Sequence, residues 1–309
     1  MNLRLLNAQP ATEYYAWQVE VNLDNLLSMG YSDNSIDVVA GYTDHIPKSW
    51  MELSKRYSNV RFHFYPDTRT DRTYAPSIQA HLLAKHWTRH PYLSKEAVFF
   101  HDCDFIFTKK FDFHKYLSDD NWYFSDCTSY LGYEYIIGKS ETLLEMMCET
   151  VDICSCKIKS NKHKGGGAQK LIKNVHAEYW EAVERDSNAL YKLMMTEKVR
   201  GMKKDDDPNP IQAWTASMWA ELWNGWKRGH NVEVPEEFNF AWATDPSNKW
   251  DMVSFYHNAG VGDANSGMFF KGNYTTSLPY DEELELDEGR CSHKYFDIVK
   301  RVGNNTCLR

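Results

Sequence analysis

The sequence lacks the signatures of several common protein classes. Its seven cysteines, at positions 103, 127, 148, 154, 156, 291 and 307, include no CxxC pair, which argues against both a zinc site and a disulfide framework. No apolar run approaches membrane-spanning length, and the opening MNLRLLNAQP holds no long apolar segment of the secretory kind. These absences predict a cytoplasmic protein in reducing surroundings.

Acidic residues outnumber basic residues overall, but basic residues are concentrated in one segment. The formal net charge is −8, which argues against a globally basic nucleic-acid binder. Residues 157–204 nevertheless hold twelve lysines and arginines against five acidic residues. A local excess of this size predicts an anionic partner for that segment.

Strand and helix patterns alternate along the first half of the chain. Strands are predicted at 3–6, 36–40, 60–65 and 98–107, and helices at 13–29, from residue 47 onward, and at 77–87. This alternation predicts an α/β fold with a mostly parallel central sheet and helices on both faces. No GxGxxG follows the first strand, so the dinucleotide-binding fingerprint is absent.

The second half mixes both patterns. Strands are predicted at 122–126, 133–137 and 252–255, and helices at 141–154, 174–195 and 211–226. A basic loop is predicted at 157–164, before the glycines of GGGAQ, and a charged linker at 201–210. Glycines at 165–167 permit positive φ and a close backbone approach to a ligand.

Two carboxylates interrupt the apolar stretch VFFHDCDFIF, at Asp102 and Asp104. Burying two carboxylates within an apolar strand is costly unless a cation neutralises them. Residues i and i+2 of an extended segment point the same way, so both can reach one ion. The two aspartates are therefore expected to share one divalent cation.

These motifs resemble the glycosyltransferases of the GT-A fold that use nucleotide sugars. The resemblance rests on the order of NAQP, WQVEV, HDCD, GGGAQ, FAWATDP and YHNAG. It implies a single GT-A-type catalytic domain over residues 1–309. The nucleotide-sugar half would span about 1–110, and the acceptor half, with the metal histidine, about 111–309.

The resemblance also implies roles for particular residues. Asp102, Asp104 and His257 would hold Mn²⁺ or Mg²⁺. The donor, for which a UDP-sugar is expected, would be bound by Asn7, Gln9, Tyr42, Arg72, Tyr74, Ser77, Lys85, Asp102, Cys103, Gly166, Gly167 and Gln169.

The catalytic base is the weakest part of the resemblance. Many GT-A enzymes carry an acidic residue early in the helix that corresponds to residues 211–226, but here that stretch reads WTASMW. Asp245 is the first candidate for the base of an inverting enzyme, and Glu221 is the second. A retaining enzyme needs no such base, and the sequence does not choose between the two.

Several acceptors and functions stay open at this stage. The basic segment from Lys157 to Lys204 predicts a polyanionic acceptor. Such an acceptor could be DNA with a hydroxymethylated base, as phage enzymes modify in the host cytoplasm, or an anionic surface glycan. The tryptophans of 211–226 could offer a stacking face to a flipped base. Rival functions are a metal-dependent phosphotransferase or nuclease that uses the same aspartates, and a carbohydrate-binding protein with a decayed site.

Overall fold

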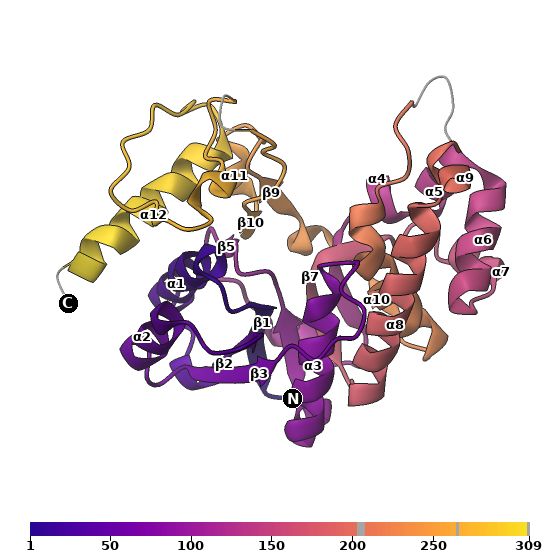
Figure 1. Ribbon diagram of the computed structural model, residues 1–309, viewed down its shortest axis with the longest axis horizontal. Helices are drawn as coiled ribbons and strands as arrows, with labels where there is room; N and C mark the ends of the chain where they lie inside the picture. The colour runs from indigo at the N-terminus through magenta and orange to yellow at the C-terminus, as the bar shows by residue number, and fades with distance from the viewer. Residues whose placement is uncertain (203–207, 264–265, 308–309) are drawn as a thin grey trace. The chain divides into compact units, whose positions relative to one another are not determined.

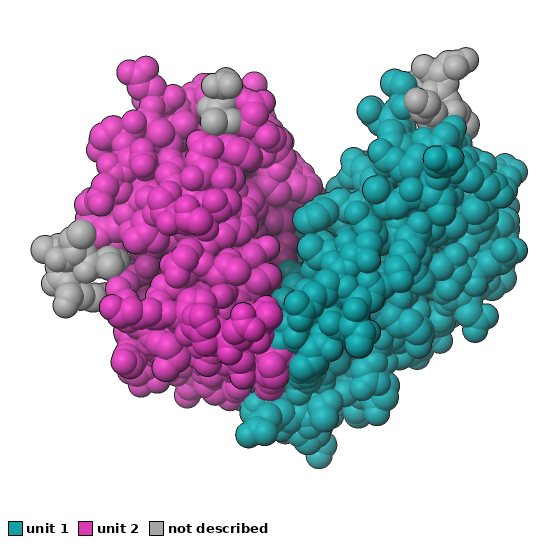
Figure 2. Space-filling model, in the orientation of Figure 1, with its two compact units in different colours: residues 1–4, 67–100, 114–236 teal, residues 5–66, 101–113, 237–309 magenta. Residues whose placement is uncertain are grey.

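The computed structural model describes residues 1–202, 208–263 and 266–307 (Figure 1). The chain forms two compact units, each built from separated stretches (Figure 2). Unit 1 comprises residues 1–4, 67–100 and 114–236, and unit 2 comprises residues 5–66, 101–113 and 237–309. The prediction of one catalytic domain over the whole chain stays a prediction.

A seven-stranded sheet, in the order β3-β2-β1-β4-β7-β6-β8, confirms the predicted α/β fold. β1–β2, β2–β3 and β6–β8 are parallel pairs, whereas β7 is antiparallel to both β4 and β6. The strands are β1 (Leu3–Pro10), β2 (Ile36–Tyr42), β3 (Arg61–Pro66), β4 (Ala97–Phe100), β6 (Trp122–Asp126), β7 (Gly166–Lys173) and β8 (Val232–Glu233).

A second, three-stranded sheet lies within unit 2. Its order is β5 (Phe105–Phe107), β10 (Phe255–His257) and β9 (Phe240–Trp242). β10 runs antiparallel to β5 and parallel to β9. This small sheet brings the C-terminal part of the chain next to the segment that follows the two aspartates.

Helices accompany the strands in both units (Figure 1). In unit 2 they are α1 (Glu13–Ser28), α2 (Lys48–Arg56), α11 (Lys249–Met252) and α12 (Cys291–Cys307). In unit 1 they are α3 (Ser77–Arg89), α4 (Thr128–Leu131), α5 (Tyr133–Lys139), α6 (Glu141–Val151), α7 (Ser155–Ser160), α8 (Ala177–Met194), α9 (Glu197–Arg200) and α10 (Ala216–Lys227). α8 packs against both α3 and α10. None of the helices in the described part of the chain is long and apolar enough to cross a bilayer.

Helix α1 holds strand β5 through buried asparagines rather than through apolar contacts alone. The Asn22 side-chain amide donates to the Phe105 carbonyl at 2.7 Å. The Asn25 amide donates to the Phe107 carbonyl at 2.9 Å, and its oxygen accepts from the Phe107 N–H at 2.8 Å. Because β5 begins directly after Asp104, these bonds fix the position of the residues that precede it.

Replacing Asn25 by alanine should therefore lower the free energy of unfolding by about 2–4 kcal/mol, because it removes two buried hydrogen bonds to the backbone of Phe107. Urea denaturation measures this change. The control is Asn248→Ala, since Asn248 is exposed and makes no side-chain cap bond to α11. Equal losses for the two variants would contradict this role of Asn25.

Several predicted elements were wrong in type or extent. The segment predicted as a strand at 133–137 forms helix α5, whose Ile136 is fully buried. For short segments rich in aromatic and β-branched residues, the packing of the half-buried apolar face decides whether a strand or a helix forms. Intrinsic strand preference is therefore a weak guide. The predicted strand at 252–255 is instead the end of α11 followed by the start of β10.

Two loops and one strand were also predicted wrongly. The basic loop predicted at 157–164 is helical as far as Ser160, and the glycines Gly166 and Gly167 lie in strand β7. Positive φ occurs at Ala168 and at none of these glycines. The predicted strand 98–107 is broken, because the chain turns between Phe100 and Phe105.

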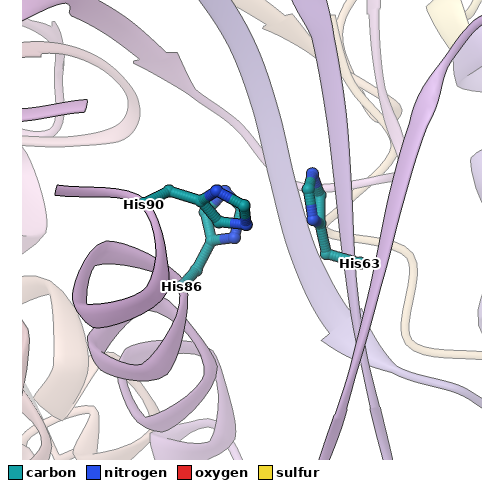
Figure 3. Close-up of side chains that lie close together, drawn as sticks. All are labelled: His63, His86 and His90. Atoms are coloured by element: carbon teal, nitrogen blue, oxygen red, sulfur yellow. The ribbon is translucent and has the colours of Figure 1, made fainter. Parts of the chain in front are cut away.

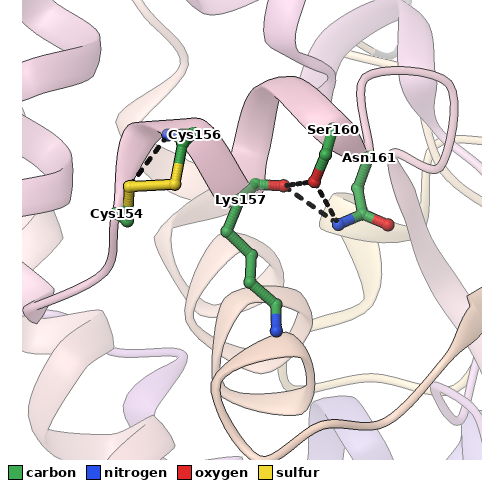
Figure 4. Close-up of a disulfide and its surroundings, with 5 residues drawn as sticks. All are labelled: Cys154, Cys156, Lys157, Ser160 and Asn161. Carbon is green, nitrogen blue, oxygen red and sulfur yellow. Dashed lines mark hydrogen bonds between the residues drawn. A yellow bond between two sulfur atoms is a disulfide. The ribbon is translucent and has the colours of Figure 1, made fainter.

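A bridge joins Cys154 and Cys156 at the start of α7 (Figure 4). Both residues are exposed, and the Cys154 sulfur accepts a hydrogen bond from the Cys156 backbone N–H at 3.2 Å. This disulfide was not predicted from the sequence, because a CxC spacing matches neither a metal site nor a disulfide framework. The predicted cytoplasmic setting stays a prediction.

Candidate metal centre

The two aspartates of the HDCD motif lie in a turn between β4 and β5. The His101 N–H donates to the Leu6 carbonyl at 3.0 Å, and the Phe105 N–H donates to the Asp102 carbonyl at 3.2 Å. In the second sheet, His257 is the register partner of Phe105. The antiparallel pairing of β10 with β5 thus brings His257 beside Asp104.

The three predicted ligands converge in unit 2. The His257 Nε2 atom lies 3.2 Å from Asp104 Oδ1 and 3.5 Å from Asp102 Oδ2. One ligand atom from each residue lies within 4.8 Å of the others. Asp104 is 4% exposed and His257 is 9% exposed, whereas Asp102 is more open. Two carboxylates and one imidazole on a partly open site fit Mn²⁺, which accepts oxygen and nitrogen ligands.

Lys271, which was not predicted from the sequence, also contacts this cluster. The Lys271 ammonium donates to the Asp104 carboxylate, across 167 positions of sequence. Lys271 is the only lysine or arginine between His257 and Arg290. That isolation was the one signal in the sequence that could have singled it out.

Burial and charge oppose each other at this cluster. Burial would raise the pKa of Asp104, but Lys271 and then His257 hold that pKa well below its usual value. Burial would lower the pKa of Lys271 and of His257, but Asp104 raises the pKa of both. The carboxylate of Asp104 is therefore a stable anion that already attracts one cation.

His101 and Cys103 flank the aspartates but are buried. Burial lowers the pKa of His101 to about 4, so its ring is neutral, and its Nδ1 lies 2.9 Å from the Asp102 carbonyl oxygen. Burial raises the pKa of the Cys103 thiol. His101 thus supports the turn, and the predicted donor contact of Cys103 stays a prediction.

The other predicted residues of unit 2 are engaged in the fold. Asn7 and Gln9 are buried on β1, where their amide groups donate to Asn22 and to the Val39 carbonyl. Their side-chain oxygens accept no hydrogen bond from the described residues. Tyr42 ends β2 and is half-buried.

Asp245, the first predicted base, also lies in unit 2. Its Oδ2 accepts from the Trp242 N–H and from the Lys249 ammonium, each at 2.8 Å. The carboxylate therefore already stabilises the turn after β9. Its role as a base stays a prediction.

The remaining predicted residues belong to unit 1. Arg72 bonds the Asp67 carbonyl, and Lys85 bonds the Thr68 hydroxyl. The hydroxyl of Ser77 donates to the Tyr74 carbonyl. These contacts order the chain at the start of α3, and the predicted donor roles of Arg72, Tyr74, Ser77 and Lys85 stay predictions.

Glu221, the second predicted base, is buried in unit 1 and ion-paired with the Lys170 ammonium. That ammonium also lies 4.8 Å from the centroid of the Phe100 ring. In the same region, the side-chain oxygen of Gln169 accepts from the Ser125 hydroxyl at 2.9 Å. A paired and buried carboxylate is poorly available to an acceptor hydroxyl.

The glycines of strand β7 are tightly packed. A Cβ added at Gly166 would lie 2.5 Å from Phe124 Cβ and 3.0 Å from Val234 Cγ1. One added at Gly167 would lie 2.3 Å from Met218 Cε. Packing inside unit 1 thus accounts for these glycines, and their predicted contact with the donor stays a prediction.

Replacing Gly166 by alanine should lower the free energy of unfolding by about 1–3 kcal/mol, because the new methyl overpacks against Phe124. Chemical denaturation measures the loss. The matched control is Gly138→Ala in α5, where nothing lies within 4 Å of the added Cβ. That control should gain up to about 1 kcal/mol from helix propensity. A neutral Gly166→Ala variant would show that the strand has room for a side chain.

Three histidines outside the metal centre are drawn in Figure 3. In unit 1, His86 in α3 and His90 just after it have ring centroids 4.8 Å apart. In unit 2, the His63 Nε2 atom lies 2.9 Å from Asp37, a buried carboxylate that also pairs with Arg61. His63 thus serves the pairing of β2 with β3.

Part of the positive charge of the basic segment is neutralised by ion pairs. Five of its twelve basic side chains pair with acidic side chains of unit 1, and Lys203 and Lys204 lie outside the described residues. The pairs are Lys164–Glu233, Lys170–Glu221, Lys173–Asp119, Arg185–Asp186 and Lys192–Asp71. Of the ten basic side chains in this segment that the structure describes, five are therefore paired with a carboxylate.

Comparisons with known proteins identify the fold. No family model and no curated protein matches the chain. The apo structure of the WbbM bifunctional glycosyltransferase aligns with a TM-score of 0.52 and 9% identity, over 98% of this chain and 51% of that one. The chain thus spans about half the length of that protein. At this identity the likeness extends to the fold.

Two further solved structures align with lower scores. The galactosyltransferase LgtC, in complex with donor and acceptor sugar analogues, gives a TM-score of 0.47 at 11% identity, over 96% of this chain and 95% of that one. The mannosyltransferase PcManGT from Pyrobaculum calidifontis, in complex with GDP-Man and Mn²⁺, gives 0.37 at 14% identity, over 77% and 55%. Nothing in these comparisons bears on a phage origin.

Proposed function

We propose that this protein is a metal-dependent glycosyltransferase that moves a sugar from a nucleotide-diphosphate donor to an acceptor hydroxyl. The observation that carries this proposal is the convergence of Asp102, Asp104 and His257 in unit 2. Its fold is also that of a protein named as a glycosyltransferase. The resemblance seen in the sequence supports a UDP-sugar as the donor.

The chemistry must stabilise the negative charge that builds up on the diphosphate as the glycosidic bond breaks. A Mn²⁺ or Mg²⁺ ion held by Asp102, Asp104 and His257 would neutralise part of that charge. Lys271 supplies a second positive group from the protein itself. Because Asp104 raises the pKa of Lys271, its ammonium stays protonated and can donate to a phosphate oxygen.

The neighbours of the cluster keep its side chains in place. The N–H of Asn258 donates to the Asp104 carbonyl at 3.0 Å, and the Trp242 ring stacks on His257 with centroids 5.9 Å apart. Side chains that such contacts hold in place stabilise charge without the cost of reorientation.

Asp245 remains the better candidate for the base of an inverting reaction, because Glu221 is buried against Lys170.

The test is the release of nucleotide from a panel of sugar donors. The full chain is incubated with UDP-, GDP-, CMP- and dTDP-sugars in Mn²⁺, and free nucleotide is quantified. We expect slow release from a UDP-sugar, its loss in EDTA and its recovery when Mn²⁺ is returned. Cleavage of nucleic acid or of a plain nucleotide, with no release from any sugar donor, would favour the phosphotransferase or nuclease alternative.

The acceptor is the open part of the proposal. A hydroxymethylated DNA base would require a phosphate-binding surface, and five of the ten described basic residues of the segment are already paired with acidic side chains. The other acceptor predicted from the sequence is an anionic surface glycan.

A further inference from the structure

One tryptophan of unit 1 differs from its neighbours in the sequence. Of the four tryptophans in the segment 211–226, Trp219, Trp223 and Trp226 are buried in the core, whereas Trp214 is 70% exposed. Leaving an indole in water forgoes the favourable burial of a large apolar side chain. The exposed indole offers an apolar face on which a ligand could stack.

The backbone that carries Trp214 is held firmly. The hydroxyl of Tyr74 donates to the Trp214 carbonyl and lies within hydrogen-bond distance of Ser217. Burial raises the pKa of Tyr74 to about 12, so this hydroxyl remains a donor. The Tyr74 ring stacks on Tyr191 with centroids 4.7 Å apart. The indole is therefore presented on a fixed base rather than on a loose loop.

A shallow pocket adjoins this ring. Its volume is about 520 Å³, within the range of roughly 300–1,000 Å³ that is typical of ligand pockets. Besides Trp214, its lining includes Tyr191, the polar residues Asn209 and Gln212, and Arg200. Arg200 is the only charged residue among the lining residues of this pocket that the structure describes.

Contacts from helix α5 anchor the chain that lines the pocket. The Lys139 ammonium donates to the Asn209 carbonyl at 2.7 Å, and the Gln212 N–H donates to the Tyr135 hydroxyl at 3.1 Å. Both Asn209 and Gln212 are exposed. The pocket thus combines a fixed aromatic face, two exposed amide residues and one guanidinium.

We propose that this pocket binds a saccharide that carries a carboxylate. The apolar face of a pyranose ring matches the indole of Trp214. The carboxylate matches the planar guanidinium of Arg200, which can hold it through two parallel hydrogen bonds. The amides of Asn209 and Gln212 can exchange hydrogen bonds with ring hydroxyls.

A nucleic acid fits the same pocket less well. Non-specific binding of a strand requires a groove of several positive charges that follows the backbone. Here one guanidinium faces the pocket, and the nearby Lys192 is paired with Asp71. One charged residue beside two aromatic residues, among those that the structure describes, matches one anionic sugar unit.

The experiment is calorimetric titration of the full chain with tetrasaccharides of galacturonate and of glucuronate, and with the same compounds after reduction of their carboxyl groups. Trp214→Ala should weaken binding of the uronates at least tenfold. Arg200→Gln should weaken it at least fivefold and remove the preference over the reduced compounds. Trp214→Phe should retain most of the affinity. Lys198→Gln, which removes a charge two positions from Arg200, should leave binding unchanged.

Three outcomes would overturn the proposal. They are the absence of uronate binding to the wild-type chain, equal binding of the reduced compounds, and uronate binding that Trp214→Ala leaves unchanged. Tighter binding of a twelve-residue oligothymidylate that depends on Trp214 would also overturn it, in favour of a nucleic acid. Since Trp214 is exposed, its loss should leave the unfolding transition intact, which a denaturation curve checks.

The failure of this inference can be told apart from the failure of the proposed function. Release of nucleotide from the donor to water requires no acceptor, so Trp214→Ala should release nucleotide at the wild-type rate. If wild type releases none from any donor but binds uronates through Trp214, the sugar-transfer proposal fails and the pocket assignment stands. If wild type releases nucleotide from a donor but binds no uronate, the pocket assignment fails and the sugar-transfer proposal stands.

Discussion

Asp104→Asn should reduce metal-dependent nucleotide release by about 10²–10³-fold, the loss expected when a preorganised charge-stabilising group is removed. The substitution keeps the shape of the side chain and removes only its charge. Asp104 is the least exposed carboxylate of the cluster, and it contacts both His257 and Lys271. Without it, the site loses a metal ligand, and the Lys271 ammonium is left without its carboxylate partner.

The measurement combines nucleotide release with titration of Mn²⁺, followed by electron paramagnetic resonance. The matched control is Asp297→Asn in α12, whose carboxylate is exposed and lies 3.6 Å from His293. The control should show wild-type rates and metal binding. If Asp104→Asn keeps more than a tenth of the activity while its folding is intact, the aspartate pair is not the metal site.

Lys271→Met should change metal binding and activity in opposite directions. Without nucleotide, the Lys271 ammonium occupies one oxygen of Asp104 and competes with any cation for that charge. Its removal should tighten Mn²⁺ binding by about tenfold, equivalent to about 1.4 kcal/mol. Nucleotide release should nevertheless fall by about 10²-fold, since the leaving diphosphate loses a charged donor.

Lys294→Met provides the control for this pair of effects. Lys294 also pairs with an aspartate of unit 2, Asp251, at 3.1 Å, but that pair is exposed. Exposed pairs contribute little, so the control should change neither quantity. Lys271→Arg should restore part of the activity, because it keeps the charge. Loss of metal binding together with activity in Lys271→Met would instead indicate a purely structural lysine.

The two aspartates of the candidate metal centre could be predicted because the cost of burying a carboxylate can be read from the neighbouring sequence. Two carboxylates between apolar runs require a counter-charge. His257 follows the apolar residues Phe255 and Tyr256. The prediction from strand geometry was nevertheless wrong in detail. Asp102 and Asp104 converge through a turn after β4 rather than through the alternation of one extended strand.

The positioning groups could not be predicted from patterns. Asn22 and Asn25 lie among the apolar residues of α1, where a periodicity argument treats them as part of the polar face. Their buried bonds to β5 depend on where that strand packs, 82 or 83 positions away in the sequence. A helical pattern does not specify which strand its buried amides will meet.

The sequence by itself determined the α/β class, from the alternation of strand and helix. It also singled out the Asp-x-Asp pair, from the cost of burying charge, and His257, from the resemblance of YHNAG to GT-A enzymes. Only the tertiary structure decided that Lys271 would face Asp104, that Lys164, Lys170, Lys173 and Lys192 of the basic segment would be paired, and that Trp214 alone of its group would be exposed. The physical reason is that ion pairs and exposure depend on chain segments brought together from distant positions. Composition and periodicity record only what each segment requires on its own.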